Sequence, residues 1–185
     1  MAKTESSMLA LGTLAPQFSL PDVVSGQTIK LSEVAGQVAT VIFFICNHCP
    51  YVKHVNPELP RLAHDYLSKG VTFLAINAND ASAYPEDSVD NMIRVSKELG
   101  YPFPYLFDET QEVARAYDAR CTPDFYVFDK QLSLVYRGQL DGSRLGNSVP
   151  LTGKSIRTAL DCLLNDMPVP SEQHPSLGCN IKFRI

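Results

Sequence analysis

Two long apolar runs, residues 38–45 and 71–77, dominate the pattern of hydrophobic and polar positions along the chain. Almost every position in these runs is apolar, whereas a strand with one face in water alternates between apolar and polar residues. Continuous runs of this length, rich in Val, Ile and Phe, are typical of strands that are covered on both faces. The sequence therefore predicts two buried strands at the centre of a sheet.

The segment between these runs shows the spacing of helices. Apolar residues recur there every three or four positions, but Pro57 and Pro60 interrupt the pattern. Proline inside a helix removes a hydrogen bond and clashes with the preceding turn, whereas it is tolerated at the first helical position. We therefore expect a short helix over 50–55, a kink, and a longer helix that runs to Lys69, with Asn56 as its N-cap.

Shorter patterned segments complete the expected fold. The further strands that we expect cover 15–20, 28–31, 105–107, 124–128 and 133–137. The further helices that we expect are a single turn at 32–36, a short helix at 110–117, and helices at about 86–99 and 153–164, the last capped by Thr152. Turn residues join the first two of these strands, and likewise the last two, into β-hairpins. This order predicts an α/β fold with a central mixed sheet flanked by helices.

Length and composition indicate a single globular domain. The chain has 185 residues, of which 45% are hydrophobic and 19% are charged. A chain of this size fits around one hydrophobic core. We expect the domain to cover residues 12–167, between a flexible N-terminus at 1–11 and a C-terminal tail at 168–185.

The charge of the chain argues against several classes of partner. The formal net charge is −4 and the pI is about 5.5, whereas nucleic acids and anionic membranes attract basic surfaces. No apolar run approaches the roughly 20 residues that span a bilayer. The N-terminal residues include Glu5 and make a poor signal peptide. We therefore expect a cytoplasmic protein with no nucleic-acid or membrane partner.

The strongest chemical signal is the sequence Cys-Asn-His-Cys-Pro at residues 46–50, directly after the first apolar run. It lies where the predicted strand passes into the predicted helix. The unpaired N–H groups and the dipole of a helix N-terminus stabilise a thiolate, which is the form of cysteine that carries out redox chemistry and binds metals. The five cysteines, at 46, 49, 121, 162 and 179, are an odd number, which does not suggest a secreted disulfide scaffold.

The start of the helix decides which thiol is the nucleophile, and Pro50 fits both possibilities. If Cys46 is the N-cap, it becomes the exposed nucleophile of low pKa, and Cys49 is the buried resolving thiol of a thiol–disulfide exchanger. If Cys49 is the N-cap, Pro50 takes the favoured first position, and Cys46 resolves a sulfenic acid formed at Cys49. His48, between the thiols, either stabilises a thiolate or points into solvent.

Two further segments point to a known family. Residues 12–22 read Gly-Thr-Leu-Ala-Pro-Gln-Phe-Ser-Leu-Pro-Asp, and residues 31–37 read Leu-Ser-Glu-Val-Ala-Gly-Gln. These segments resemble the start of the alkyl hydroperoxide reductase/thiol-specific antioxidant (AhpC/TSA) family, and the resemblance covers roughly residues 12–165. It implies a thioredoxin-like fold in which a cis peptide bond between Thr122 and Pro123 faces the dithiol.

The resemblance extends to a peroxiredoxin-like subgroup with Cys-Pro-Tyr-Val after the strand and a terminal Ser-x-Gly-Cys-x-Ile-Lys, here residues 176–182. The chain departs from true peroxiredoxins, whose peroxidatic cysteine lies in Pro-x-x-x-Thr/Ser-x-x-Cys. With Cys49 as that cysteine, Cys46 holds the Thr/Ser position and Phe43 holds the Pro position. The arginine that polarises peroxide has no clear counterpart; Arg120 lies near the corresponding region but beside the Thr-Pro. These departures favour Cys46 as the attacking thiol.

The other three cysteines, at 121, 162 and 179, lie outside the dithiol motif. By the resemblance, Cys121 lies beside the dithiol, where it either takes part in exchange or acts as a small buried apolar residue. Cys179 is either a remote resolving thiol or a packed one. Cys162 lies among leucines on the last predicted helix, and we expect it in the core.

We expect the remaining candidate features to be structural. The histidines outside the dithiol show no ligand spacing and are expected at the surface; they are His54, His64 and His174. The aromatic run at 125–128 is expected in the sheet core. The loop at 140–147 contains two glycines but lacks the strand-to-helix frame of a phosphate site, so we expect a surface loop near the dithiol.

These residues predict a thiol-dependent oxidoreductase that forms a disulfide between Cys46 and Cys49. The supporting residues are His48, Pro50, Cys121, Thr122 and Pro123, and Cys179 is a candidate resolving thiol. The expected partners are a thiol electron donor, either thioredoxin-like or a small thiol, and a disulfide or peroxide substrate, with no cofactor and no metal. Two alternatives stay open: a thiol peroxidase with Cys49 as the peroxidatic cysteine, and a non-catalytic protein that binds a metal or a partner through the same thiols.

Overall fold

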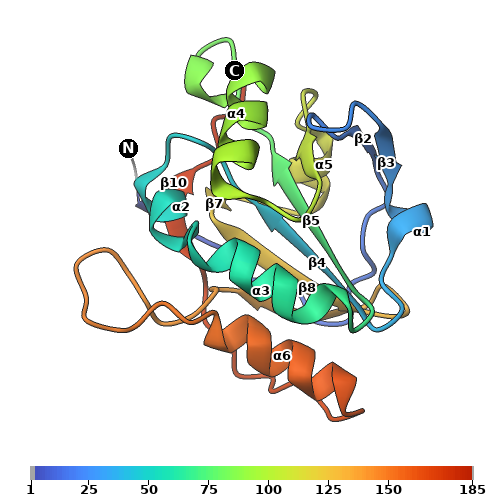
Figure 1. The fold of residues 1–185 in the computed structure, drawn as a ribbon. Coiled ribbons are helices and arrows are strands. Elements are labelled where there is room, and N and C mark those ends of the chain that lie inside the picture. Colours follow the sequence, from blue (N-terminus) through green and yellow to red (C-terminus); the bar gives the residue numbers. More distant parts are fainter. Residues whose placement is uncertain (1–2, 185) are drawn as a thin grey trace.

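The computed structural model describes residues 3–184, and its centre is a five-stranded mixed sheet with the strand order β6-β5-β4-β8-β9 (Figure 1). The strands are β4 (Ala39–Phe44), β5 (Val71–Asn77), β6 (Tyr105–Phe107), β8 (Asp124–Asp129) and β9 (Leu134–Gly138). Strands β4, β5 and β6 are parallel, whereas β8 is antiparallel to both β4 and β9. The two long apolar runs are thus adjacent inner strands, and the aromatic run in β8 is buried, as predicted.

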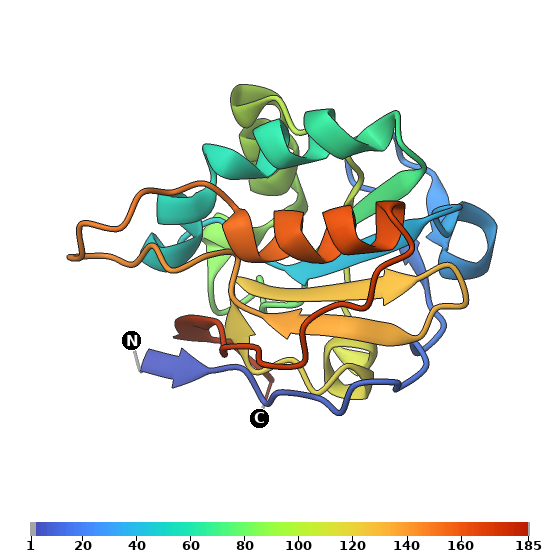
Figure 2. The same cartoon turned by 90° about the horizontal axis from the view of Figure 1, so that it is seen from below.

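Helices cover both faces of this sheet, which confirms the predicted α/β architecture (Figures 1 and 2). One core contains apolar residues of α2 (Pro50–Val55), α3 (Glu58–Leu67), α4 (Val89–Leu99) and α6 (Lys154–Leu164). The other core contains residues of α1 (Leu31–Val34) and of α5 (Glu112–Ala116). Within residues 3–184, no helix has both the length and the apolar character needed to cross a membrane.

Short strands tie both ends of the chain to the domain. The N-terminal hairpin is present but shorter than expected, with β2 (Ser19–Pro21) paired to β3 (Thr28–Lys30). Within the segments expected as an N-terminus at 1–11 and a C-terminal tail at 168–185, β10 (Leu177–Asn180) lies between β1 (Lys3–Glu5) and β7 (Cys121–Thr122) in a three-stranded sheet. The backbone N–H and C=O groups of these strands hydrogen-bond to one another. The short polar sequences of the strands gave no sign of this pairing. Figure 2 shows β1 beside the C-terminal segment. Residues 1–2 and 185 lie outside the described residues.

The caps of two helices differ from the prediction. Asn56 closes α2, and Pro57 is the N-cap of α3. Pro60 therefore falls at the third helical position, where a backbone N–H has no acceptor within the helix. Gly153, with a φ of 66°, takes the N-cap of α6 in place of Thr152, because glycine adopts this left-handed conformation without strain.

The helix expected at 86–99 is divided into two elements. A 3₁₀ turn, η1, covers Pro85–Asp87, and α4 begins only after Ser88, whose side chain accepts a hydrogen bond from the backbone N–H of Asn91. The helix ends at Gly100, as predicted. The break leaves Asp87 in a turn near the end of β5, where it contributes to the site described next.

Candidate active site

The dithiol lies where the central strand β4 gives way to α2. The strand ends at Phe44, and α2 begins with Pro50, whose missing N–H costs nothing in the first turn. Because Pro50 holds the first helical position, Cys49 is the N-cap residue. The expectation that Cys46 caps the helix and is exposed is therefore wrong: Cys46 is 2% exposed, and Cys49 is 0% exposed.

A loop with a cis-proline faces both sulfur atoms. The peptide bond between Thr122 and Pro123 is cis, as the family resemblance implied. The hydroxyl oxygen of Thr122 lies 3.3 Å from Sγ of Cys46, and its carbonyl oxygen lies 3.3 Å from Sγ of Cys49. One residue of this loop thus contacts both thiols.

The C-terminal strand β10 brings a third thiol to the site. Cys179 pairs with Thr122 across β10 and β7 and is 3% exposed. Its thiol and its backbone N–H both hydrogen-bond to the sulfur of Cys49. Cys179 is therefore part of the dithiol site and not a remote residue.

Hydrogen bonds from several directions make Cys49 the more acidic thiol. Donation from the thiol of Cys46 is the largest cause that lowers the pKa of Cys49, to about 5. Donation from Cys179 and from the backbone N–H of Val52 lowers it further, against the effect of burial. The Cys49 thiol can also donate to the Thr122 carbonyl, which favours the protonated form. Its effect on the pKa of Cys49 is smaller than the combined effect of the four hydrogen bonds that are donated to the sulfur.

The pKa of Cys46 moves in the opposite direction. Its hydrogen bond to Cys49 is the largest cause that raises the pKa of Cys46, followed by burial and by the negative charge of Asp87. Two thiols in hydrogen-bond contact share one negative charge, and the N-terminus of α2 favours its location on Cys49. The geometry therefore reverses the expected polarity, in which Cys46 was the thiol of low pKa.

Asp87, which the sequence patterns did not single out, anchors the loop between the two thiols. Its carboxylate is fully buried. It accepts hydrogen bonds from the backbone N–H of Asn47 at 2.6 Å and from the side-chain amides of Asn77 at 3.3 Å and Asn79 at 2.8 Å. A usable signal was present, because Asn77 ends the inner strand β5 and Asn79 follows it, and functional side chains in such sheets gather beyond the carboxyl ends of the strands.

His48 completes the group around Asp87. Its Nδ1 lies 2.7 Å from Oδ2 of Asp87, and this hydrogen bond is the largest cause that raises the pKa of His48. The ring stacks on Tyr84 with 5.3 Å between centroids, and the side chain is 12% exposed, so it does not point into solvent. The positive charge of His48 also interacts favourably with a Cys49 thiolate. Its Nε2 is buried, and none of residues 3–184 hydrogen-bonds to it.

Cys46, His48 and Asp87 also form a group of the kind that holds a metal ion. One ligand atom of each residue lies within 4.8 Å of the other two. The oxygens of Asp87, however, already contact four hydrogen-bond partners. A carboxylate whose lone pairs are engaged binds a cation only when those partners leave. The arrangement therefore fits a hydrogen-bond network better than a metal centre.

Other predicted residues lie outside this group. Arg120 is exposed and pairs with Asp118 at 3.3 Å, so it is not positioned to polarise a peroxide at Cys49. Cys121 is buried in β7, and its thiol donates to the Pro123 carbonyl. The prediction that Cys162 lies in the core is wrong, because this residue is partly exposed. The buried residues of α6 are Ile156, Ala159 and Leu160.

The loop at 140–147 packs against α2 and does not lie wholly at the surface. His64 and His174 are exposed, as expected. His54 is half-buried, which corrects the surface prediction, and its Nε2 lies 2.8 Å from Oγ of Ser143. Leu140, Asp141 and Ser143 of the loop are buried, whereas residues 145–147 are exposed.

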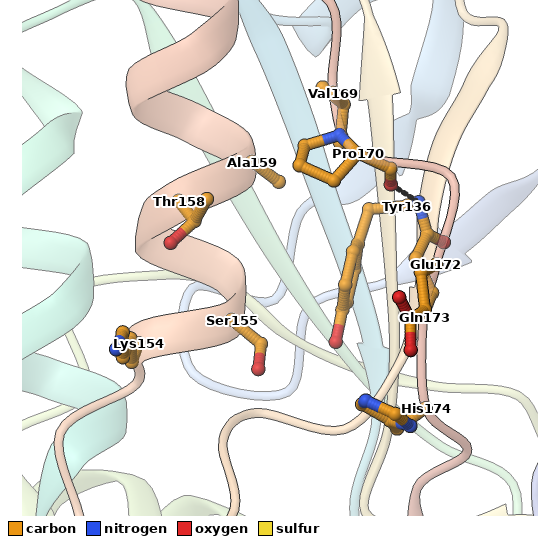
Figure 3. A pocket seen from close by; sticks show the side chains of 10 residues that line it. All are labelled: Tyr136, Lys154, Ser155, Thr158, Ala159, Val169, Pro170, Glu172, Gln173 and His174. Carbon is orange, nitrogen blue, oxygen red and sulfur yellow. Dashed lines mark hydrogen bonds between the residues drawn. The ribbon is translucent and has the colours of Figure 1, made fainter.

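A separate pocket, which we call the α6 pocket, lies between α6 and residues 169–174 (Figure 3). Its volume is about 180 Å³, and its lining includes Tyr136 of β9 and Ser155 and Thr158 of α6. Figure 3 also shows the hydrogen bond at 2.8 Å from Nε2 of Gln173 to the Pro170 carbonyl. No cysteine lines this pocket, so it is distinct from the dithiol site.

Comparisons with known proteins agree with the fold and the thiol chemistry. Residues 11–137 match the AhpC/TSA family. The protein named thiol-disulfide oxidoreductase ResA from Halalkalibacterium halodurans is 28% identical over 131 residues, which are 71% of this chain and 69% of that protein. An uncharacterized conserved protein from Geobacillus kaustophilus has a solved structure with 62% identity and a TM-score of 0.98, over 100% of this chain and 97% of that chain.

A more distant structure shows the fold class. A thiol:disulfide interchange protein of the thioredoxin family from Chlorobium tepidum TLS has 19% identity and a TM-score of 0.65. The alignment covers 84% of this chain and 98% of that chain. The chain therefore has a thioredoxin-like fold.

Proposed function

We propose that this chain, which belongs to the AhpC/TSA family, is a thiol–disulfide oxidoreductase whose Cys46–Cys49 pair cycles between a dithiol and a disulfide. The observation that carries this proposal is the hydrogen bond between the two sulfurs at the N-terminus of α2, which lowers the pKa of Cys49. A thiolate in contact with a second thiol is the arrangement that disulfide exchange requires. The name of the ResA relatives supports the same chemistry.

The geometry supports Cys49 as the first nucleophile. Its thiolate attacks one sulfur of a substrate disulfide, so that a mixed disulfide forms and one substrate thiolate leaves and takes up a proton. Cys46 then loses its proton and attacks the Cys49 sulfur. The Cys46–Cys49 bond forms, the second substrate thiol leaves, and two electrons have passed to the substrate. An external thiol donor, either thioredoxin-like or a small thiol, returns the pair to the dithiol.

Burial of the thiols bears on the choice of substrate. Cys46 and Cys49 are almost completely covered, and disulfide exchange requires direct contact between sulfurs. Small disulfides therefore reach the pair more readily than disulfides inside folded proteins. We expect faster reduction of a small aromatic disulfide than of a protein disulfide.

A second candidate function is a thiol peroxidase with Cys49 as the peroxidatic cysteine. The position of Cys49 before Pro50 and its low pKa favour this alternative. The Cys49 thiolate would attack the peroxide O–O bond, forming a sulfenic acid and releasing water or an alcohol. Cys46 would then displace the hydroxyl as water and close the disulfide. Against this function, Arg120 does not face the site.

The test is reduction of a small aromatic disulfide by the wild type and by three variants, with glutathione as the donor. Cys49→Ser should abolish turnover, Cys46→Ser should lower it, and Cys162→Ser, which removes a partly exposed thiol on α6, should leave it unchanged. In Cys46→Ser the first mixed disulfide with the substrate should form at Cys49. If the substrate is instead trapped at Cys46 in Cys49→Ser, and no mixed disulfide forms at Cys49 in Cys46→Ser, Cys46 is the first nucleophile.

The same preparation separates the alternatives. Rapid consumption of peroxide without disulfide reduction would favour the peroxidase. A stoichiometric metal ion bound to the reduced protein, without turnover of either substrate, would favour the binding function and reject the oxidoreductase.

A further inference from the structure

Cys49 has a thiol on either side of it. Cys46 precedes it in the loop after β4, and Cys179 lies on β10, and the thiols of both donate hydrogen bonds to its sulfur. All three residues are buried in the same core cluster. Disulfide exchange requires an attacking sulfur in contact with its target. Both neighbours of Cys49 meet this requirement, but the proposed cycle uses only one of them.

The backbone fixes the position of Cys179. Strand β10 pairs with β7 so that Cys179 lies opposite Thr122, the residue that contacts both other thiols. A Cβ atom at Gly178 would lie 1.9 Å from the Thr122 carbonyl oxygen, so the close approach of β10 to the cis-proline loop requires glycine there. The hydroxyl of Ser176 donates to the Pro123 carbonyl at 2.5 Å. These contacts hold Cys179 against the dithiol.

We propose that Cys179 is a second resolving thiol, which competes with Cys46 for Cys49. In this step the sulfur of Cys179 loses its proton and attacks the Cys49 sulfur of the Cys46–Cys49 disulfide. The Cys49–Cys179 bond forms, the Cys46–Cys49 bond breaks, and Cys46 leaves as a thiolate that takes up a proton. No electrons enter or leave the protein, so the step requires no further oxidant or reductant.

This inference rests on the proposed function, because it requires an oxidised Cys49. It adds a second internal disulfide, which joins the start of α2 to the C-terminal strand β10. The same attack resolves a mixed disulfide between Cys49 and a substrate, with the second substrate thiol as the leaving group. Cys46 is then free as a thiol while Cys49 remains oxidised.

The test is disulfide mapping by mass spectrometry after mild oxidation with glutathione disulfide and alkylation of the remaining thiols. In Cys46→Ser, we expect an internal bond between Cys49 and Cys179. In the double variant Cys46→Ser/Cys179→Ser, we expect Cys49 to remain a mixed disulfide with glutathione. The matched control is Cys46→Ser/Cys162→Ser, which lacks a thiol outside the site and should still form the Cys49–Cys179 bond.

Two outcomes separate this inference from the proposed function. If Cys46→Ser holds glutathione on Cys49 while Cys179 alkylates freely, the second resolving thiol is rejected, although a Cys46–Cys49 bond in the wild type would still support the oxidoreductase. If the wild type forms no internal disulfide at Cys49, the proposed function itself fails. Cys179→Ala is mapped in parallel in the Cys46→Ser background, with thermal unfolding of each variant, so that a folding defect caused by serine is recognised.

Discussion

The dithiol site and the α6 pocket differ in the exposure of their residues and in the pKa values of their ionisable groups. The α6 pocket has a volume of about 180 Å³, and Lys154, Thr158 and His174 in its lining are exposed. Cys46 and Cys49 have almost no accessible surface, yet their pKa values are strongly shifted in opposite directions. The shifted pKa values therefore mark the dithiol as the candidate functional site, although it has no cavity.

Buried polar groups that are hydrogen-bonded to one another can therefore shift the pKa values of neighbouring thiols at a site that has no cavity. Asp87 holds the backbone of Asn47 and the ring of His48, and no comparable buried carboxylate lines the α6 pocket. Away from water these electrostatic contacts are stronger, so they shift pKa values and also contribute to stability. Four predictions, in order of decreasing expected effect, test the difference between the dithiol site and the α6 pocket.

The largest effect is expected for Asp87→Ala. The change leaves the backbone N–H of Asn47 and the side-chain amides of Asn77 and Asn79 without their buried acceptor. We expect the free energy of unfolding to fall by about 3 kcal/mol and the melting temperature to fall by roughly 6–12 °C. Urea and thermal unfolding measure both quantities.

The matched control for Asp87→Ala is Asp161→Ala on α6. Asp161 is exposed, and its carboxylate accepts a hydrogen bond from the hydroxyl of Tyr66 at 2.7 Å. We expect this change to cost less than about 1 kcal/mol. Equal losses at the two positions would show that Asp87 is not a special anchor and would remove the contrast between the two regions.

The second effect concerns the pKa of Cys49. Cys46→Ala removes the largest cause that lowers this pKa to about 5, so we expect a rise of roughly one to two pH units. Cys46→Ser keeps a donor and should give a smaller rise. The measurement is the rate of alkylation of Cys49 against pH in a Cys162→Ser background. A pKa that stays near its original value would assign the effect to the helix N-terminus and not to the neighbouring thiol.

The third effect is a pH dependence of stability at the His48–Asp87 pair. The pKa of His48 is raised in the folded protein by its hydrogen bond to Asp87, so its contribution is complete below the unfolded value of about 6.5 and is lost as the pH rises through the raised pKa. Burial opposes ionisation of Asp87, but its hydrogen bonds, first that from His48, lower its pKa overall. The contribution of Asp87 is therefore lost in acid, below about pH 4.

The variant for this prediction is His48→Phe, which keeps a ring against Tyr84 but cannot ionise. We expect a loss of up to about 1 kcal/mol near pH 5.5 and a smaller loss near pH 9. Unfolding by urea at the two pH values measures the difference. A loss that is larger at the alkaline value would contradict the charged pairing of His48 with Asp87.

The smallest effect is expected in the α6 pocket. Thr158 lines this pocket and is exposed, and Thr158→Ala should change the free energy of unfolding by less than about 0.5 kcal/mol. Disulfide reduction and the alkylation rate of Cys49 should not change. A clear change in either would show that the pocket is coupled to the dithiol, and the contrast between the two regions would then need revision.

The sequence by itself determined the framework of this protein. The continuous apolar runs at 38–45 and 71–77 form inner strands because only strands covered on both faces can bury residues of this kind at every position. The N-terminal segments at 12–22 and 31–37 indicated the family. These features depend on the local order of residues, so they can be read without a structure.

The sequence did not decide which of the two thiols has the lower pKa. The pattern around Pro50 allowed the helix to begin after either cysteine, because proline is tolerated at several positions of the first turn. The fold resolved this by placing Cys49 at the N-cap. The helix start thus agrees with the preference of proline for the first helical position, one of the two starts that the sequence allowed.

Only the tertiary structure brought Asp87 and Cys179 to the dithiol. Asp87 is 40 residues from the loop that it holds, and Cys179 reaches the site through the pairing of β10 with β7. Hydrogen bonds between distant segments leave no periodic signal in the sequence, because each requires only one suitable side chain at one point. The sequence therefore located the two thiols, whereas the folded chain decided which of them carries the charge and which third thiol stands beside it.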